Sequence, residues 1–148
     1  MDPAHVTGWA ADENELASFL DEPNLARVGT IDRHGFAHVT PAWYHWDGEK
    51  FYIGADAADA KVANVRRSGM ASIEIDGDVR RKRGILARGT AVVVDGPEGK
   101  AAYERISIPQ VRRYLPDRGP IEMAAKMASK GDPVVIEVLP AGIISWGR

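Results

Sequence analysis

The chain has 148 residues, of which 45% are hydrophobic, and a formal net charge of −2 at pH 7. This size and apolar content suit one domain with a single core. The small net charge gives no reason to expect a nucleic acid or an anionic membrane as a partner, which leaves small ligands and other proteins.

The sequence contains no cysteine. This excludes disulfides, thiolate nucleophiles and cysteine-ligated zinc, and it agrees with a reducing compartment. The first residues have neither the basic start nor the apolar stretch of a signal peptide, and no run of roughly 18 apolar residues occurs. We therefore expect a cytoplasmic protein without a membrane span.

The first expected element is a helix that begins at Asp12 or Asn14, either of which can cap it, and ends at Pro23. Its apolar residues recur at helical spacing, namely Leu16, Phe19 and Leu20. Residues 1–24 thus form an N-terminal arm and helix.

A β-hairpin is expected next, because residues 25–31 and 36–46 alternate and Asp32–Gly35 is typical of a turn. Pro41 cannot donate a ladder hydrogen bond, so the second strand should bulge or meet a sheet edge there. Successive side chains point to opposite faces. One face should therefore hold Phe36, His38, Thr40, Ala42, Tyr44 and Trp46, and the other Val39, Pro41, Trp43 and His45.

Asp47-Gly48 predicts a second tight turn into a strand over residues 50–55. A short helix follows, with Asp56 as its expected cap. Its buried stripe should consist of Ala58, Val62 and Val65 at positions i, i+4 and i+7, which places Lys61, Asn64 and Arg66 off that stripe.

The remaining elements are strands over residues 70–76 and 85–94, joined by a basic turn, and a helix that begins at Pro97. Pro109 and Pro116 should break the following region before a helix over 121–130. One strand or a pair of strands covers 134–139 and 143–146. The whole pattern predicts a single domain, mainly β, with six or seven antiparallel strands closed into a barrel (residues 25–95), a helical segment (97–130) and C-terminal strands (133–148).

Lys61 is the first candidate for a functional side chain. It lies in the first turns of its helix, where the unpaired amides and the ammonium group together favour a phosphate. A solvated surface lysine is the alternative, and the spacing alone leaves both interpretations open.

The other polar and aromatic residues give weaker indications of function. His38 and His45 fall on opposite faces of one strand, so they cannot share a metal ion, and we expect no metal site. No serine lies in a GxSxG motif, so an enzyme of this sequence would depend on a bound cofactor. Trp43, Tyr44 and Trp46 either fill the core or wall a pocket for a flat heterocycle.

The basic turn, residues 80–83, is the remaining candidate. A solvated hairpin tip is the simplest interpretation of Arg80, Arg81, Lys82 and Arg83. One of the arginines could instead reach a partner subunit and hold an anionic ligand. A nucleic-acid patch is the least favoured interpretation in a chain of balanced charge.

Four segments carry a resemblance to a known family: LARVGTIDRHGFAHVTPAWYHWDGEKFYIGA, AKVANVRRSGMASIEIDG, RGTAVVVD and the final ISWGR. Together they resemble the pyridoxamine 5'-phosphate oxidase-like superfamily. The resemblance lies in the order of hairpin, Lys-x-x-Asn helix, strand and Gly-x-Ala strand. It implies the flavin-binding split β-barrel fold and a homodimer whose two grooves each hold a cofactor, either FMN or the 5-deazaflavin coenzyme F420.

The resemblance also implies a set of cofactor-binding residues. Lys61 would meet the cofactor phosphate, with Asn64 completing the Lys-x-x-Asn motif. The strand of His38, Val39, Thr40, Pro41, Ala42 and Trp43 would run along the ring, and Ala55, Asp56, Ala57 and Ala58 would form the phosphate loop. Trp146 would approach the ring from the other subunit.

The implied activity is hydride transfer to a small, electron-poor organic substrate. FMN-binding members often have serine or threonine before the lysine, where this chain has Ala57, Ala58, Asp59 and Ala60, and the overall pattern is closer to the deazaflavin-dependent branch. The C-terminus has no recognisable pyridoxal-phosphate-binding tail. Tyr44 and His38 are the candidate proton donors. A non-catalytic cofactor carrier, or a haem-binding protein that uses His38 or His45, is the alternative.

Overall fold

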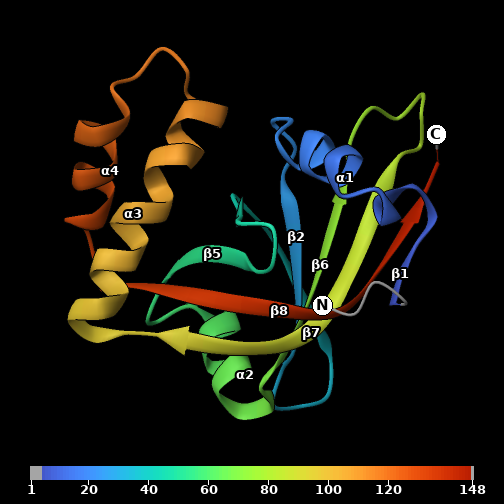
Figure 1. Ribbon diagram of the computed structural model, residues 1–148. Coiled ribbons are helices and arrows are strands. Elements are labelled where there is room, and N and C mark those ends of the chain that lie inside the picture. The colour runs from blue at the N-terminus through green and yellow to red at the C-terminus, as the bar shows by residue number, and fades with distance from the viewer. Residues whose placement is uncertain (1–4, 148) are drawn as a thin grey trace.

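The computed structural model describes residues 5–147. In chain order its elements are β1 (Val6–Thr7), the 3₁₀ helix η2 (Gly8–Ala11), α1 (Glu13–Leu20), β2 (Ala26–Ile31), β3 (Ala37–Ala42), β4 (His45–Trp46), β5 (Phe51–Asp56), α2 (Ala60–Ser68), β6 (Met70–Asp76), β7 (Gly84–Val94), α3 (Gly96–Tyr114), α4 (Pro120–Ala128) and β8 (Pro133–Trp146). Figure 1 shows these elements. None of the helices within residues 5–147 is long and apolar enough to cross a membrane.

One eight-stranded sheet forms the body of the molecule, with the strand order β3-β2-β6-β7-β8-β5-β4 and β1 added beside β8. All neighbours on the main path are antiparallel. β3 and β4 lie at opposite ends of this order, yet only Trp43 and Tyr44 separate them in the chain. Such a short link spans about 10 Å, so the sheet must curl until its two edges approach each other. The predicted split barrel is confirmed.

The link between β3 and β4 corrects the expectation of one strand over residues 36–46. β3 pairs with β2, whereas β4 pairs with β5. The predicted faces hold within β3, where His38, Thr40 and Ala42 are more buried than Val39 and Pro41. Just after β3, the side chain of Tyr44 is buried and its hydroxyl donates a 2.7 Å hydrogen bond to the carbonyl of Leu20.

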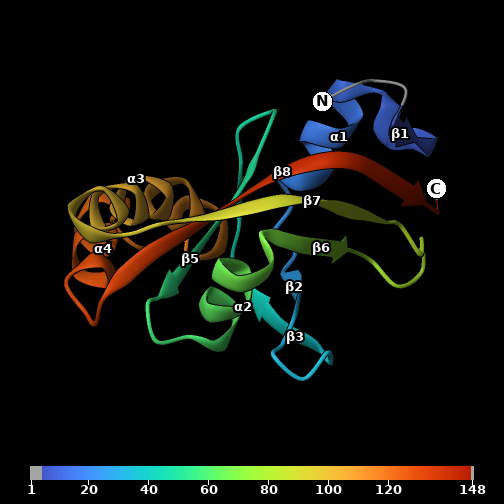
Figure 2. The same ribbon diagram turned by 90° about the horizontal axis from the view of Figure 1, so that it is seen from below.

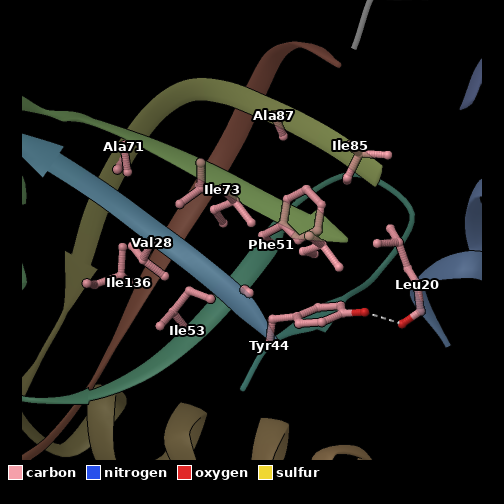
Figure 3. Close-up of a cluster of buried hydrophobic side chains, with 14 of the residues drawn as sticks. Leu20, Val28, Tyr44, Phe51, Ile53, Ala71, Ile73, Ile85, Ala87 and Ile136 are labelled. Atoms are coloured by element: carbon pink, nitrogen blue, oxygen red, sulfur yellow. Dashed lines mark hydrogen bonds between the residues drawn. The ribbon is translucent and has the colours of Figure 1, made fainter. Parts of the chain in front are cut away.

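The barrel core lies inside this curled sheet, and Figure 3 shows its central part. Large side chains from several strands and from the link between β3 and β4 are fully buried there, including Tyr44, Phe51, Ile53, Ile73 and Ile136. α1 packs Phe19 and Leu20 against the same core. Its predicted cap is confirmed, since Oδ1 of Asp12 accepts hydrogen bonds from the amides of Asn14 and Glu15.

The C-terminal segment is one continuous strand, β8, and pairs with β7 along its length. The register shifts where Arg88 faces Gly142 and Gly89 faces Pro140, which leaves Ala141 as a bulge. A Cβ at Gly89 would lie 1.9 Å from the carbonyl oxygen of Leu139, so only glycine fits there. The bulge lets one long strand take the place of the expected pair.

α2 differs in detail from its prediction. It begins at Ala60 with Asp59 at the N-cap position, so Asp56 is not its cap. Asp56 instead accepts hydrogen bonds from the amides of Ala58 and Asp132. Ala58 is exposed and Asn64 is buried, which reverses the expected positions of these two residues. The buried residues of α2 are Val62, Asn64 and Val65, so the predicted burial of Val62 and Val65 is confirmed.

α3 and α4 form a helical hairpin on one side of the sheet, where β7 ends and β8 begins (Figure 1 and Figure 2). Pro109 lies inside α3 and does not break it, contrary to expectation. The proline removes one helical hydrogen bond. Packing of α3 against α4 and β8 holds the helix through this point, with Ala102, Ile106 and Val111 buried.

Candidate functional site

A cavity of 270 Å³ lies where the barrel splits. The end of β3 and the following link form one wall, and β5, α2, α3 and α4 supply the rest. Its lining residues are Pro41, Ala42, Trp43, Gly54, Lys61, Tyr103, Gln110 and Met127. We call this the split pocket. The structure therefore brings together four residues of the predicted site, Pro41, Ala42, Trp43 and Lys61.

Lys61 is not a solvated surface lysine. Its side chain is only 12% exposed, and its ammonium lies 3.4 Å from Oδ2 of Asp59. α2 places it there, because Lys61 is the second residue of the helix and faces back toward the chain entering it. A cation enclosed beside the amides of a helix start can bind an oxyanion.

The loop before α2 is tied down by its own carboxylates. Oδ2 of Asp59 accepts a hydrogen bond from the amide of Asp56, and the carboxylate of Asp56 accepts from Ala58 and Asp132. The amide of Ala57 donates to the carbonyl of Asp132. These contacts fix the predicted phosphate loop, although they place two negative charges beside it.

A second cavity of 200 Å³ adjoins the split pocket. Tyr103 and Met127 belong to both cavities, so they form the shared wall. Ala55 and Asp56, two more residues of the predicted site, line the second cavity with Lys130 and Pro133. Ala57 packs against the core beside them.

Aromatic rings fix the shape of the split pocket. Trp43 stacks on Tyr114 of α3, with ring centroids 4.8 Å apart and an interplanar angle of 20°. Tyr103 approaches β5 so closely that a Cβ at Gly54 would lie 2.8 Å from its Cε2 atom. Burial, together with the carboxylates of Asp59 and Asp56, raises the pKa of Tyr103. The pocket is therefore preformed and its tyrosine stays neutral at ordinary pH.

Besides Gly54 of β5, three lining residues were missed by the sequence analysis, namely Tyr103, Gln110 and Met127. They come from α3 and α4, outside the segments that resemble the superfamily. Within α3, Tyr103 and Gln110 are seven residues apart and so face the same side. That spacing was the available signal, but it does not say what the helix faces.

Unpartnered polar atoms test whether the site suits a planar, phosphate-bearing cofactor. Within residues 5–147, the buried side-chain atoms without a hydrogen-bond partner include Nδ1 of His38, Oγ1 of Thr40 and Nε2 of Gln110. Buried polar groups normally have partners. Gln110 is a lining residue of the pocket, whereas His38 and Thr40 lie on β3 outside its lining. Lys61 and Gln110 are thus the lining residues that fit a phosphate-bearing ligand.

The other predicted residues lie outside the split pocket. Val39 lines a separate groove on the outer surface of the sheet. Asn64 donates a 3.0 Å hydrogen bond to Oγ1 of Thr30, and its Oδ1 accepts from Arg67. Trp146 lies at the far end of β8, where its carbonyl accepts from Nε1 of Trp9. Within this one chain, neither Asn64 nor Trp146 reaches the cavity beside Lys61.

The two candidate proton donors differ in availability. The hydroxyl of Tyr44 is buried and bound to Leu20, and burial raises its pKa. His38 is half-buried with Nδ1 unpartnered. Tyr44 therefore stabilises the core. His38 and the newly found Tyr103 remain as groups that could donate a proton.

The basic turn lies between β6 and β7. Arg80 is highly exposed and pairs with Asp78, as a solvated tip would. Arg83 is enclosed instead, since it pairs with Glu15 and its guanidinium lies 3.9 Å from the centroid of the Trp9 ring. The four basic residues therefore do not form one continuous surface.

Comparisons with known proteins agree with this architecture. The chain is 27% identical to the conserved hypothetical protein Rv2991 from Mycobacterium tuberculosis, with a TM-score of 0.77 over 97% of this chain and 88% of that one. It is 25% identical to an F420 reductase, with a TM-score of 0.64 over 85% of this chain and 93% of that one. HutZ, the heme storage protein from Vibrio cholerae, has the same fold at 15% identity and a TM-score of 0.69, over 88% of this chain and 92% of HutZ.

No curated protein matches the sequence. A family model does: the one described as pyridoxamine 5'-phosphate oxidase matches residues 12–147. This match spans the barrel, the split pocket and the helical hairpin. The chain belongs to the pyridoxamine 5'-phosphate oxidase family.

Proposed function

We propose that this protein is a homodimeric oxidoreductase that uses FMN or the deazaflavin coenzyme F420 to transfer hydride to a small, electron-poor organic substrate. The observation that carries the proposal is the enclosed ammonium of Lys61 in a preformed pocket at the split of the barrel. The family and the likeness to an F420 reductase support a redox coenzyme.

The residues of the site would hold the coenzyme in three places. Lys61 would neutralise its phosphate, helped by the amides at the start of α2. The strand from His38 to Trp43 would bind the ring system, and the loop from Ala55 to Ala58 would enclose the phosphate. When bound, the coenzyme supplies the hydride, and the protein contributes binding, orientation and exclusion of water.

Of the two coenzymes, F420 is favoured by two observations. The residues before Lys61 are Ala57, Ala58, Asp59 and Ala60, so that stretch offers no side-chain hydroxyl to a phosphate. The 25% identity to an F420 reductase points the same way. A cytoplasmic location, proposed from the absence of cysteine, agrees with either coenzyme.

The homodimer would complete the site. A groove of 710 Å³ with a mostly apolar lining runs over β2, β3, β6 and β7 on the outer surface of the sheet. Val39 and Met70 line it and are each 59% exposed. A contiguous exposed apolar surface of this kind is typical of a subunit interface. Trp146, which lies far from Lys61 within one chain, would reach the ring across that interface.

The test is a fluorescence titration of the purified protein with FMN and with F420, in parallel, for the wild type and Lys61→Met. The substitution removes the ammonium while keeping a side chain of similar length. We expect at least tenfold weaker binding, because a hydrogen bond to a charged group contributes about 1.5–3 kcal/mol.

Lys126→Met is the matched control, since Lys126 is an exposed lysine of α4 outside the pocket lining. Its coenzyme affinity should stay within about twofold of the wild type. Wild-type protein that binds neither coenzyme would contradict the proposal. So would a haem absorption band in the purified protein, which would favour the haem-binding alternative.

A further inference from the structure

Gln110 is the most unusual polar residue of the split pocket. It is 4% exposed, and its Nε2 has no hydrogen-bond partner within the described residues 5–147. A buried amide without a partner costs about 1–3 kcal/mol. Its neighbour on the same helix, Ser107, is equally buried but donates a 2.6 Å hydrogen bond to the carbonyl of Tyr103. The missing partner is therefore a property of Gln110 and not of this part of α3.

Gln110 shares the split pocket with Lys61. It lines the same 270 Å³ cavity as Lys61, but comes from α3, whereas Lys61 comes from α2. The residues between them on the cavity wall are apolar or aromatic, including Pro41, Ala42, Trp43 and Met127. One ammonium-bearing and one amide-bearing side chain, carried by two helices, thus line the same small cavity.

Such an arrangement suits an oxyanion. A phosphate has several acceptor oxygens and can accept from an ammonium and an amide at once, and its charge pairs with Lys61. An apolar group would leave the Gln110 donor unpaired, and a cationic group would meet Lys61. Lys61 and Gln110 together therefore favour a group that carries negative charge on oxygen, although such a group must compete with Asp59 for the ammonium of Lys61.

We propose that Gln110 donates a hydrogen bond to the phosphate group of the bound coenzyme, so that the helical hairpin of α3 and α4 supplies half of the phosphate site. This inference rests on the proposed function for the identity of the ligand. It extends the site beyond β3, the loop and α2 to a helix that the sequence analysis left without a role.

The first test compares ligands with and without phosphate. Gln110→Leu and Gln110→Glu would be titrated with FMN and with riboflavin, and with F420 and its phosphate-free deazaflavin core. We expect Gln110→Leu to weaken binding of the phosphate-bearing ligands on the order of tenfold and Gln110→Glu to weaken it more. Binding of the phosphate-free ligands should change less than twofold. Ser107→Ala is the control and should leave all four affinities unchanged.

The second test needs no coenzyme. The side-chain amide signals of Gln110 in the wild-type protein, assigned by their loss in Gln110→Leu or by selective labelling, are followed by NMR during titration with inorganic phosphate. A saturable shift is expected, and it should be absent in Lys61→Met at the same concentrations.

The outcomes separate the two proposals. If the coenzymes bind but Gln110→Leu binds them as the wild type does and phosphate does not shift its amide, Gln110 has no ligand role while the proposed function survives. Equal losses for FMN and riboflavin would place the amide at the ring and overturn the phosphate assignment. If neither coenzyme binds, the proposed function fails, and the phosphate titration alone decides Gln110: a shift supports the inference and its absence overturns it.

Discussion

Two helices of this protein each bury one side-chain amide, and the two amides have opposite surroundings. On α2, Asn64 is 3% exposed, donates to Thr30 and accepts from Arg67. On α3, Gln110 is 4% exposed and its nitrogen has no partner within residues 5–147. One amide joins a helix to the sheet, whereas the other faces a cavity.

The difference shows that burial alone does not reveal whether a side-chain amide stabilises the fold or is available to a ligand. From the sequence, Asn64 was a member of a cofactor motif and Gln110 was an unremarked polar residue in a helix. The contacts suggest the reverse division, with Asn64 stabilising the fold and Gln110 available to a ligand. Substitutions on each helix can test that division.

The largest effect on stability should come from Asn64→Leu. The change leaves the hydroxyl of Thr30 without its donor and removes one of the two acceptors of Arg67, which keeps the carbonyl of Ile31. These losses should lower the free energy of unfolding by about 2 kcal/mol. Urea denaturation measures it. In a double-mutant cycle with Thr30→Val the two losses should be less than additive. A loss below about 0.5 kcal/mol would show that the amide is not structural.

A smaller effect on ligand affinity is expected at the start of α2. Asp59→Asn removes the carboxylate 3.4 Å from the ammonium of Lys61 but keeps an oxygen that can accept from the amide of Asp56. Affinity for the phosphate-bearing coenzyme should rise about two- to fivefold, since partly exposed pairs contribute up to about 1 kcal/mol. Asp95→Asn removes the partner of Arg66 on the same helix and serves as the control. Weaker binding in Asp59→Asn would contradict the inference that Asp59 competes with the coenzyme phosphate for Lys61.

A pH-dependent effect is expected beside α3. Burial, and then the guanidinium of Arg113, lower the pKa of His45, with Asp47 opposing them. The unfolded chain therefore takes up this proton first, and the stability contributed by neutral His45 is lost as pH falls below about 6.5. His45→Gln should lose less thermal stability than the wild type between pH 7.5 and 5.0. Parallel curves of melting temperature against pH would refute this role for His45.

The smallest effect on stability is expected at Gln110. Gln110→Leu replaces an unpartnered donor with an apolar group of similar size, so the unfolding free energy of the ligand-free protein should change by less than about 0.5 kcal/mol or increase. Urea denaturation in parallel with Asn64→Leu gives the contrast directly. A loss as large as that of Asn64→Leu would mean that both amides are structural.

Most of the fold could be predicted because its signals are local. Asp12 caps α1, Asp47-Gly48 turns β4 into β5, and alternation marks β2, β6 and β7. The errors occurred where distant contacts overrule local pattern. Packing carries α3 through Pro109, and a hydrogen bond from Tyr44 to Leu20 accompanies the break in the strand expected over residues 36–46.

The sequence predicted the residues that β3, its following link and α2 contribute to the candidate site, but not those that α3 and α4 contribute. Lys61 and the run Pro41–Trp43 lie in recognisable segments, and the structure places them around one cavity. Tyr103, Gln110 and Met127 lie on helices whose sequences show an apolar face but not what it packs against. Their part in the pocket depends on how the hairpin docks against the sheet.

The sequence by itself determined the order of strands and helices and the cationic start of α2, because turn residues, alternation and helix spacing act between near neighbours in the chain. Only the tertiary structure decided which amide is satisfied, where β3 gives way to β4 and what faces Lys61. Those features depend on contacts between residues tens of positions apart, such as Asn64 with Thr30 and Trp43 with Tyr114, and no local pattern encodes them.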